Sequence, residues 1–181
     1  MGKRSDFPRR PNDEYETPYK GVLPLIPMLS GVRTFAEPCA GPGLLLRHLR
    51  LFDLHCTYDG DIQQGRDALD QTAASMGHPD VIITNPPWTR ALLYPLIRHF
   101  QRIAPTWLLF DADWQHNVQA TPFLVHCSHV VSVGRLKWIA NSKHSGGYDN
   151  AAWYRFHIQH TDGPRLVPRR RPLHNRKGEA S

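Results

Sequence analysis

The sequence has few cysteines and no long apolar run. Its 181 residues include three cysteines, Cys39, Cys56 and Cys127, and none stands at Cys-x-x-Cys spacing. Isolated thiols of this kind are typical of a reducing compartment. No apolar run approaches the roughly 20 residues that span a bilayer, and the polar N-terminus is not followed by the apolar region of a secretion signal. We therefore expect a cytoplasmic protein that does not bind membranes.

Metal-ligand patterns are also scarce. The run from His126 to His129 contains two histidines and a cysteine, but no second ligand pair stands at zinc spacing. We therefore expect no metal. The length fits one domain with a sizeable core, and a hydrophobic content of 40% is that of a soluble globular protein.

The middle of the chain lacks the positive charge that its ends carry. The formal net charge is +6, yet residues 1–11 have four cationic side chains against one acidic, and residues 163–181 have six against one. Pro- and Arg-rich ends are typically disordered in isolation and attract phosphates regardless of sequence. We expect a basic disordered arm at 1–11, a folded domain at 12–162 and a basic tail at 163–181. The ends either bind nucleic acid or only confer solubility.

The most informative segment is Asn-Pro-Pro-Trp at 85–88, directly after the apolar run 80–84. A β-branched run closed by two prolines predicts a buried strand that ends at once, followed by a stiff loop. In open α/β sheets, ligands bind at the carboxyl ends of the strands. The loop holds an amide, backbone carbonyls and an aromatic face, which suit a flat ring that carries an amino group. The alternative is a cis-proline turn with a packing tryptophan.

A glycine-containing segment predicts a second loop of this kind. Residues 32–37 predict a short strand, followed by a tight turn and a helix through about Leu51. Gly41 and Gly43 let the backbone approach a ligand, and the helix N-terminus offers free N–H groups. The alternative is a plain strand–turn–helix connection.

The remaining elements complete an alternating pattern. Residues 54–58 predict a strand, and either Asp59 or Asp61 after it is placed to accept both hydroxyls of a ribose. Further along we expect a helix at 89–103 that Thr89 caps and Pro95 interrupts, a strand at 106–110, and a hairpin of strands at 129–138 and 151–158. Strands alternating with helices predict a three-layer α/β sandwich, mostly parallel, with an antiparallel C-terminal hairpin.

These segments resemble S-adenosylmethionine-dependent amino methyltransferases, especially the DNA N6-adenine enzymes of the small type that phages and prophages encode. The resemblance rests on Asn-Pro-Pro-Trp at 85–88, Glu-Pro-x-x-Gly-x-Gly at 37–43 and Tyr-x-Thr-Pro at 15–18. Many relatives have glycine where Cys39 stands, so the turn there differs. The resemblance implies a Rossmann-like methyltransferase fold, S-adenosylmethionine as cofactor, and DNA, or else RNA, as partner.

The resemblance also implies residue roles. The catalytic set is Asn85, Pro86, Pro87 and Trp88. The cofactor set is Tyr15, Thr17, Pro18, Glu37, Pro38, Cys39, Gly41, Gly43, Asp59, Asp61, Asp67 and Asn85. The substrate set is Trp88, Lys143, His144, Tyr148, Arg169, Arg170 and Arg171. A surface carboxylate explains Asp67 equally well, and an ordinary loop explains residues 140–150.

We expect transfer of a methyl group to adenine N6 in DNA with little sequence preference, because no long recognition segment separates the motifs. Several alternatives stay open. They are the same chemistry on RNA adenine or on cytosine N4, methylation of a protein glutamine at N5, and a catalytically silent nucleic-acid-binding protein. Cytosine N4 enzymes more often have serine where Asn85 stands. The sequence does not give the oligomeric state.

Overall fold

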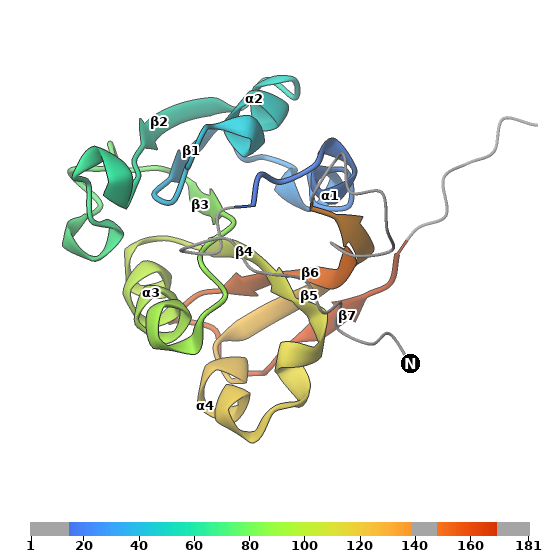
Figure 1. The fold of residues 1–181 in the computed structure, drawn as a ribbon. Helices are drawn as coiled ribbons and strands as arrows, with labels where there is room; N and C mark the ends of the chain where they lie inside the picture. The colour runs from blue at the N-terminus through green and yellow to red at the C-terminus, as the bar shows by residue number, and fades with distance from the viewer. Residues whose placement is uncertain (1–14, 139–147, 170–181) are drawn as a thin grey trace, which may run out of the picture.

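Seven strands form one mixed sheet in the part of the chain that the computed structural model describes, residues 15–138 and 148–169 (Figure 1). The strands are β1 Thr34–Glu37, β2 His55–Asp59, β3 Val81–Thr84, β4 Thr106–Asp111, β5 Cys127–Lys137, β6 Tyr148–Phe156 and β7 Arg165–Val167. Their order across the sheet is β2-β1-β3-β4-β6-β5-β7. Strands β1 to β4 are parallel, whereas β6 runs antiparallel to both β4 and β5. The predicted fold class is confirmed.

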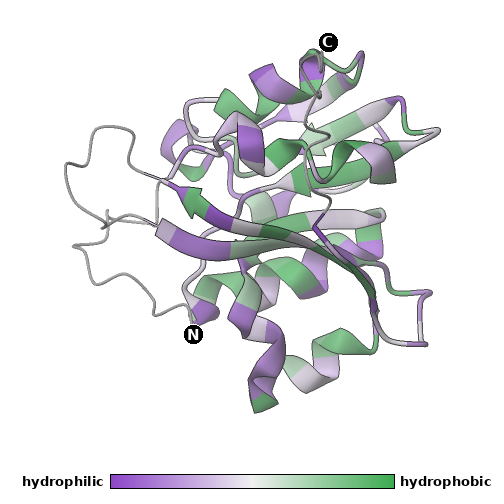
Figure 2. Ribbon diagram, turned by 90° about the vertical axis from the view of Figure 1, so that its right-hand side faces the viewer, coloured by the Kyte–Doolittle hydropathy of each residue, from purple (hydrophilic) through white to green (hydrophobic). Residues whose placement is uncertain are grey.

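Helices cover both faces of the sheet. They are α1 Tyr19–Val22, α2 Leu44–Arg50, α3 Arg90–Ile103 and α4 Thr121–Leu124, with short 3-10 turns between them. One buried cluster joins the sheet to α1 and α2, and a second joins it to α3 and α4. Figure 2 shows hydrophobic and hydrophilic residues mixed along the helices around the sheet. No helix in the described ranges is long and apolar enough to cross a bilayer.

Strand β3 shows why the apolar run 80–84 is continuous rather than alternating. Val81 and Ile83 belong to the cluster beneath α1 and α2, whereas Ile82 belongs to the cluster beneath α3. Successive side chains of a strand point to opposite faces, and both faces of this sheet are covered. The strand is therefore buried on both sides, and it ends at Thr84, immediately before the two prolines.

The predicted helix after the Pro-Pro loop is present, with two corrections. Thr89 occupies the N-cap position of α3, but its side chain does not cap the helix. Pro95 lies inside α3 and does not interrupt it, since the helix continues to Ile103. Proline lacks the N–H that would bond one turn back. The apolar face of α3, packed on the core through side chains such as Leu93 and Phe100, holds the helix in place nonetheless.

The sheet extends further than the hairpin. The hairpin strands begin at Cys127 and end at Phe156, each about two residues earlier than expected. Strand β7 then pairs in parallel with β5, with Arg165 opposite His129. β7 lies inside the segment 163–181 expected to be a basic tail, so part of that segment belongs to the sheet. The expected arm at 1–11, Lys143, His144, Arg170 and Arg171 lie outside the described residues.

Candidate functional site

A cavity of about 360 Å³ opens where the carboxyl ends of β1, β2 and β3 meet. Its walls come from the chain before α1, the loops after these three strands, and the first half of α3. Ten of the predicted site residues line it: Tyr15, Thr17, Glu37, Pro38, Cys39, Gly41, Asp61, Asp67, Asn85 and Pro87. The parallel topology explains this convergence, because parallel strands end at one edge.

The loop after β1 is held open by its glycines. Gly41 and Gly43 have φ angles of 50° and 83°, and Gly43 is the left-handed residue that precedes α2. Other residues adopt this backbone region at a cost, whereas glycine does not. A Cβ on Gly41 would meet no atom within 4 Å, so conformation rather than crowding explains this glycine. The turn folds the chain back over the cavity edge.

Backbone bonds join this loop to the loop after β2. The Gly60 N–H donates to the Glu37 carbonyl at 3.1 Å, and the Ala40 N–H donates to the Gly60 carbonyl at 2.9 Å. The Gly41 N–H then donates to Asp61 Oδ2 at 2.9 Å. These bonds hold the two loops together at the edge of the cavity.

The structure separates the two acidic candidates after β2. Asp61 lines the cavity, and its second oxygen, Oδ1, accepts from the Gln63 N–H at 3.0 Å. Asp59 is the exposed last residue of β2 and does not line the cavity. Both Asp61 oxygens keep further lone pairs for a ligand. Asp67 also lines the cavity, and its Oδ1 accepts from the Leu69 N–H at 2.9 Å.

Glu37 places a buried carboxyl group on the cavity wall. Its side chain is 1% exposed, and Oε2 has no hydrogen-bond partner among the described residues. Burial raises its pKa well above the ordinary value of 4.5, and the nearby Asp59 and Asp61 carboxylates raise it further. A cationic ligand in the cavity would supply the missing partner.

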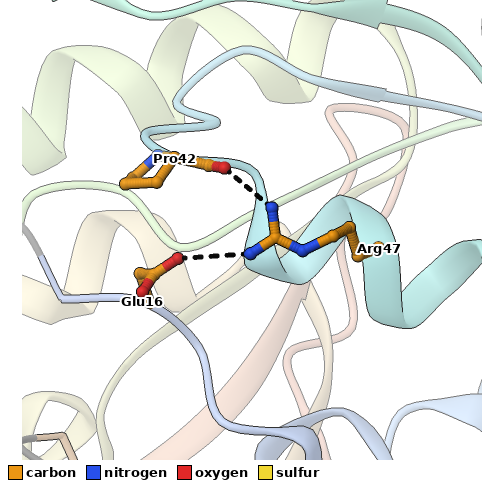
Figure 3. A network of polar contacts seen from close by, with 3 residues as sticks. All are labelled: Glu16, Pro42 and Arg47. Atoms are coloured by element: carbon orange, nitrogen blue, oxygen red, sulfur yellow. Dashed lines mark hydrogen bonds and ion pairs between the residues drawn. The ribbon is translucent and has the colours of Figure 1, made fainter.

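The segment before α1 closes one side of the cavity. Thr17 is buried, and its hydroxyl has no partner within the described part of the chain. Arg47 of α2 bridges this segment to the glycine loop (Figure 3). Its Nη1 donates to the Pro42 carbonyl at 3.1 Å, and its Nη2 lies 3.6 Å from Glu16 Oε1. The guanidinium thus links two walls of the cavity.

The Asn85 side chain is held at both ends. Its Nδ2 donates to the Tyr15 carbonyl at 2.9 Å, and its Oδ1 accepts from Trp88 Nε1 at 3.1 Å. Trp88 packs edge-on against Trp138, with ring centroids 5.4 Å apart and an interplanar angle of 87°. The described residues contain no cis peptide bond, so the loop is not a cis-proline turn, whereas the packing of Trp88 agrees with the second half of that alternative.

Cys39 contributes a neutral thiol. Burial raises its pKa to about 12, so the thiol stays protonated near neutral pH. Thr84 Oγ1 donates to the Cys39 carbonyl at 3.5 Å, which ties the turn to the end of β3. Cys39 therefore contributes an uncharged side chain to the cavity wall.

Other predicted site residues lie outside the cavity wall. Pro18, Gly43, Asp59, Pro86 and Trp88 do not line it, and Pro86 is buried. Tyr148 begins β6, beneath the Arg135 guanidinium at 5.5 Å. Arg169 follows β7, and its Nη1 lies 2.9 Å from where a Cβ on Gly134 would stand. Tyr148 and Arg169 therefore lie on the hairpin side of the sheet.

Sequence reasoning missed an apolar part of the wall. Ile62, Leu69 and Leu92 line the cavity although they are 59%, 41% and 46% exposed. Leu92 lies near the start of α3. Its position one turn beyond the Pro-Pro loop is the signal that places it at the cavity. No group of three or more metal-ligating side chains occurs among residues 15–138 and 148–169.

Known proteins resemble this chain in their solved structures but not in their sequences. No protein-family model and no curated protein matches the sequence. One similar structure is a candidate RNA methyltransferase from Pyrococcus horikoshii, with a TM-score of 0.60, 16% identity, and coverage of 86% of this chain and 91% of the other. Another is a candidate class I S-adenosylmethionine-dependent methyltransferase from Listeria monocytogenes, with a TM-score of 0.55, 12% identity, and coverage of 88% and 67%. This chain has the Rossmann-like fold of those methyltransferases.

Proposed function

We propose that this protein transfers a methyl group from S-adenosylmethionine to the exocyclic N6 amine of adenine in DNA, with little sequence preference. The observation that carries the proposal is Asn85. Its oxygen is fixed as a hydrogen-bond acceptor, and the residue lines a cavity whose other walls suit a cationic adenosyl cofactor.

The charge of the cavity supports this cofactor. Four lining residues are acidic, namely Glu16, Glu37, Asp61 and Asp67, and none of the lining residues is lysine or arginine. Such walls repel the phosphates of a dinucleotide and attract the sulfonium and ammonium of S-adenosylmethionine. The unpartnered Glu37 oxygen and Thr17 hydroxyl suit its methionine end, Asp61 its ribose, and the apolar Ile62, Leu69 and Leu92 its adenine.

The chain's own contribution to catalysis is orientation. An adenine amine is a weak nucleophile because its lone pair is delocalised into the ring. The cofactor, when bound, supplies a methyl group already activated by the sulfonium. Asn85 Oδ1 and the Pro86 carbonyl each accept a hydrogen bond from one N–H group of the amine. Together they direct the lone pair of the amine at that methyl group. The prolines fix the loop beforehand, so little conformational entropy is lost when the base binds.

Nucleic acid would approach along the hairpin side of the sheet. Arg135 and Arg169 are exposed there, with Arg135 over the Tyr148 ring, and Trp138 contacts Trp88 of the catalytic loop. The basic residues at both ends of the sequence, including Arg170 and Arg171, would add phosphate contacts that weaken with salt, as would Lys143 and His144 of the internal segment 140–150. A duplex would have to release the target base, which would then stack on Trp88.

RNA is the second candidate substrate. The same acceptors fit adenine in either polymer, and one structurally similar protein is a candidate RNA methyltransferase. The deciding experiment is incubation of the protein and methyl-labelled cofactor with DNA, RNA and protein pools, each kept separate, followed by mass spectrometry of digested nucleosides. We expect N6-methyldeoxyadenosine from the DNA pool. Label found in protein glutamine alone, or in no pool, would reject the proposal.

A further inference from the structure

The Asn85 amide cannot be turned around in this site. A backbone carbonyl only accepts hydrogen bonds and an indole N–H only donates them. Nδ2 must therefore face the Tyr15 carbonyl, at 2.9 Å, and Oδ1 must face Trp88 Nε1, at 3.1 Å. The partners fix the assignment of oxygen and nitrogen on chemical grounds.

Trp88 is itself fixed by packing. Its half-buried ring contacts both hydrophobic clusters and meets the Trp138 ring edge-on at 5.4 Å. The Tyr15 ring lies 6.4 Å from the same Trp138 ring. Asn85, Trp88, Trp138 and Tyr15 thus form a closed ring of contacts that joins the catalytic loop, the residue after β5 and the segment before α1.

We propose that Trp88 is a positioning residue, whose indole N–H holds Asn85 Oδ1 as the acceptor for the target amine. The proposal rests on the function proposed above and adds a role to base stacking. An amide oxygen has two lone-pair directions. The indole N–H occupies one, and the other remains for a single N–H of the substrate. A phenylalanine or tyrosine at this place would offer a ring face but no N–H at that position.

Fixing the oxygen also determines which groups the site accepts. The terminal torsion of asparagine is broad, so an amide without the indole bond samples orientations that present Nδ2 as well as Oδ1. With the bond, only an acceptor faces the substrate. A ring that carries an amine is then bound, and a ring that carries a carbonyl at the same place is rejected. Substituting hypoxanthine for the target adenine should abolish binding at this position.

Trp88→Phe separates positioning from stacking. It keeps an aromatic face and removes the N–H. We expect kcat for the nucleic acid substrate to fall about three- to tenfold, in line with the net value of one hydrogen bond. The KM for nucleic acid and the affinity for S-adenosylmethionine should stay within about twofold. A raised KM with unchanged kcat would show that Trp88 only stacks, and would overturn the proposal.

A matched control comes from Trp114. It is a buried tryptophan whose Nε1 makes no hydrogen bond within the described chain, and it does not line the cavity. Trp114→Phe removes an indole N–H of the same kind from the core. We expect its kcat to match that of the parent protein, and a fall equal to that of Trp88→Phe would contradict a specific role for Trp88.

A measurement without turnover keeps this proposal separate from the proposed function. The Trp88 indole proton is assigned in the NMR spectrum of the parent protein by its loss in Trp88→Phe. We expect it to exchange slowly with solvent and, in Asn85→Ala, to move upfield and exchange faster. An unchanged resonance would overturn the proposal even in an active enzyme. A changed resonance in a protein that methylates no pool would instead reject the proposed function alone.

Discussion

The two sides of the cavity are built in different ways. On the side of β1 and β2, backbone hydrogen bonds and the Asp61 carboxylate hold the loops together, and all of these partners lie within about 25 residues of one another. On the side of β3, the acceptor loop is held by side chains whose partners are far away in sequence. Asn85 bonds to Tyr15, 70 residues earlier. The first side depends on local conformation, and the second depends on the completed fold.

Asn85→Ala should have the largest effect on the acceptor side. Loss of one preorganised hydrogen-bonding group typically lowers kcat by 10² to 10³, roughly 2.7–4 kcal/mol in the transition state. Cofactor affinity, measured by calorimetric titration, should change by no more than about threefold, because the walls from β1 and β2 remain. A variant that loses affinity and rate equally would show that the two sides are not independent.

Asp61→Asn tests the other side. The carboxylate accepts two backbone N–H bonds, at 2.9 and 3.0 Å, and hydrogen bonds to a charged group contribute about 1.5–3 kcal/mol. We expect affinity for S-adenosylmethionine to fall about 10- to 100-fold. Asp59→Asn is the matched control, since Asp59 precedes Asp61 by two residues and does not line the cavity. Equal losses in both variants would contradict the assignment of Asp61.

Because the Glu37 carboxyl is buried, we expect the stability of the fold and the affinity for the cofactor to change with pH in opposite directions. Its pKa is raised in the folded state, so its contribution to stability is fully present below about pH 4.5 and is lost as the pH rises through the raised value. The cationic cofactor prefers the ionised carboxyl, so its affinity should rise over the same interval. Each pKa unit corresponds to about 1.4 kcal/mol.

Glu37→Gln should remove both pH dependences. Thermal unfolding of the cofactor-free variant at pH 7 should occur at a higher temperature than in the parent protein, while titration shows weaker cofactor binding. A variant that is less stable than the parent at pH 7 would contradict the burial argument. Melting curves and titrations at pH 5 and pH 8 provide the comparison.

Arg47→Met should have the smallest effect. The pair with Glu16 is exposed on both sides, at 58% and 42%, and such pairs contribute about 0–1 kcal/mol. We expect a two- to fivefold loss of cofactor affinity in low salt that shrinks as salt is added. Arg50→Met, at the exposed end of the same helix, is the control and should show no loss.

The same contrast explains how much the sequence predicted. Strand β3, the glycine turn and the presence of an acidic residue after β2 follow from local signals, since proline, glycine and a continuous apolar run act on neighbouring residues. Sequence reasoning left Asp59 and Asp61 unresolved, because the choice depends on a bond to Gly41, 20 residues away. The Tyr15 and Trp138 contacts to the loop at 85–88 have no local signal, and neither does the pairing of β7 with β5.

The central claim places the methyl donor beside the fixed oxygen of Asn85. A crystal structure with S-adenosylhomocysteine and an adenine-containing oligonucleotide tests it most directly. The account predicts the cofactor sulfur in the cavity between Glu37 and Asn85, with the adenine amine bonded to Asn85 Oδ1 at about 2.9 Å. A cofactor bound elsewhere, or an Asn85 that turns its nitrogen to the base, would contradict it.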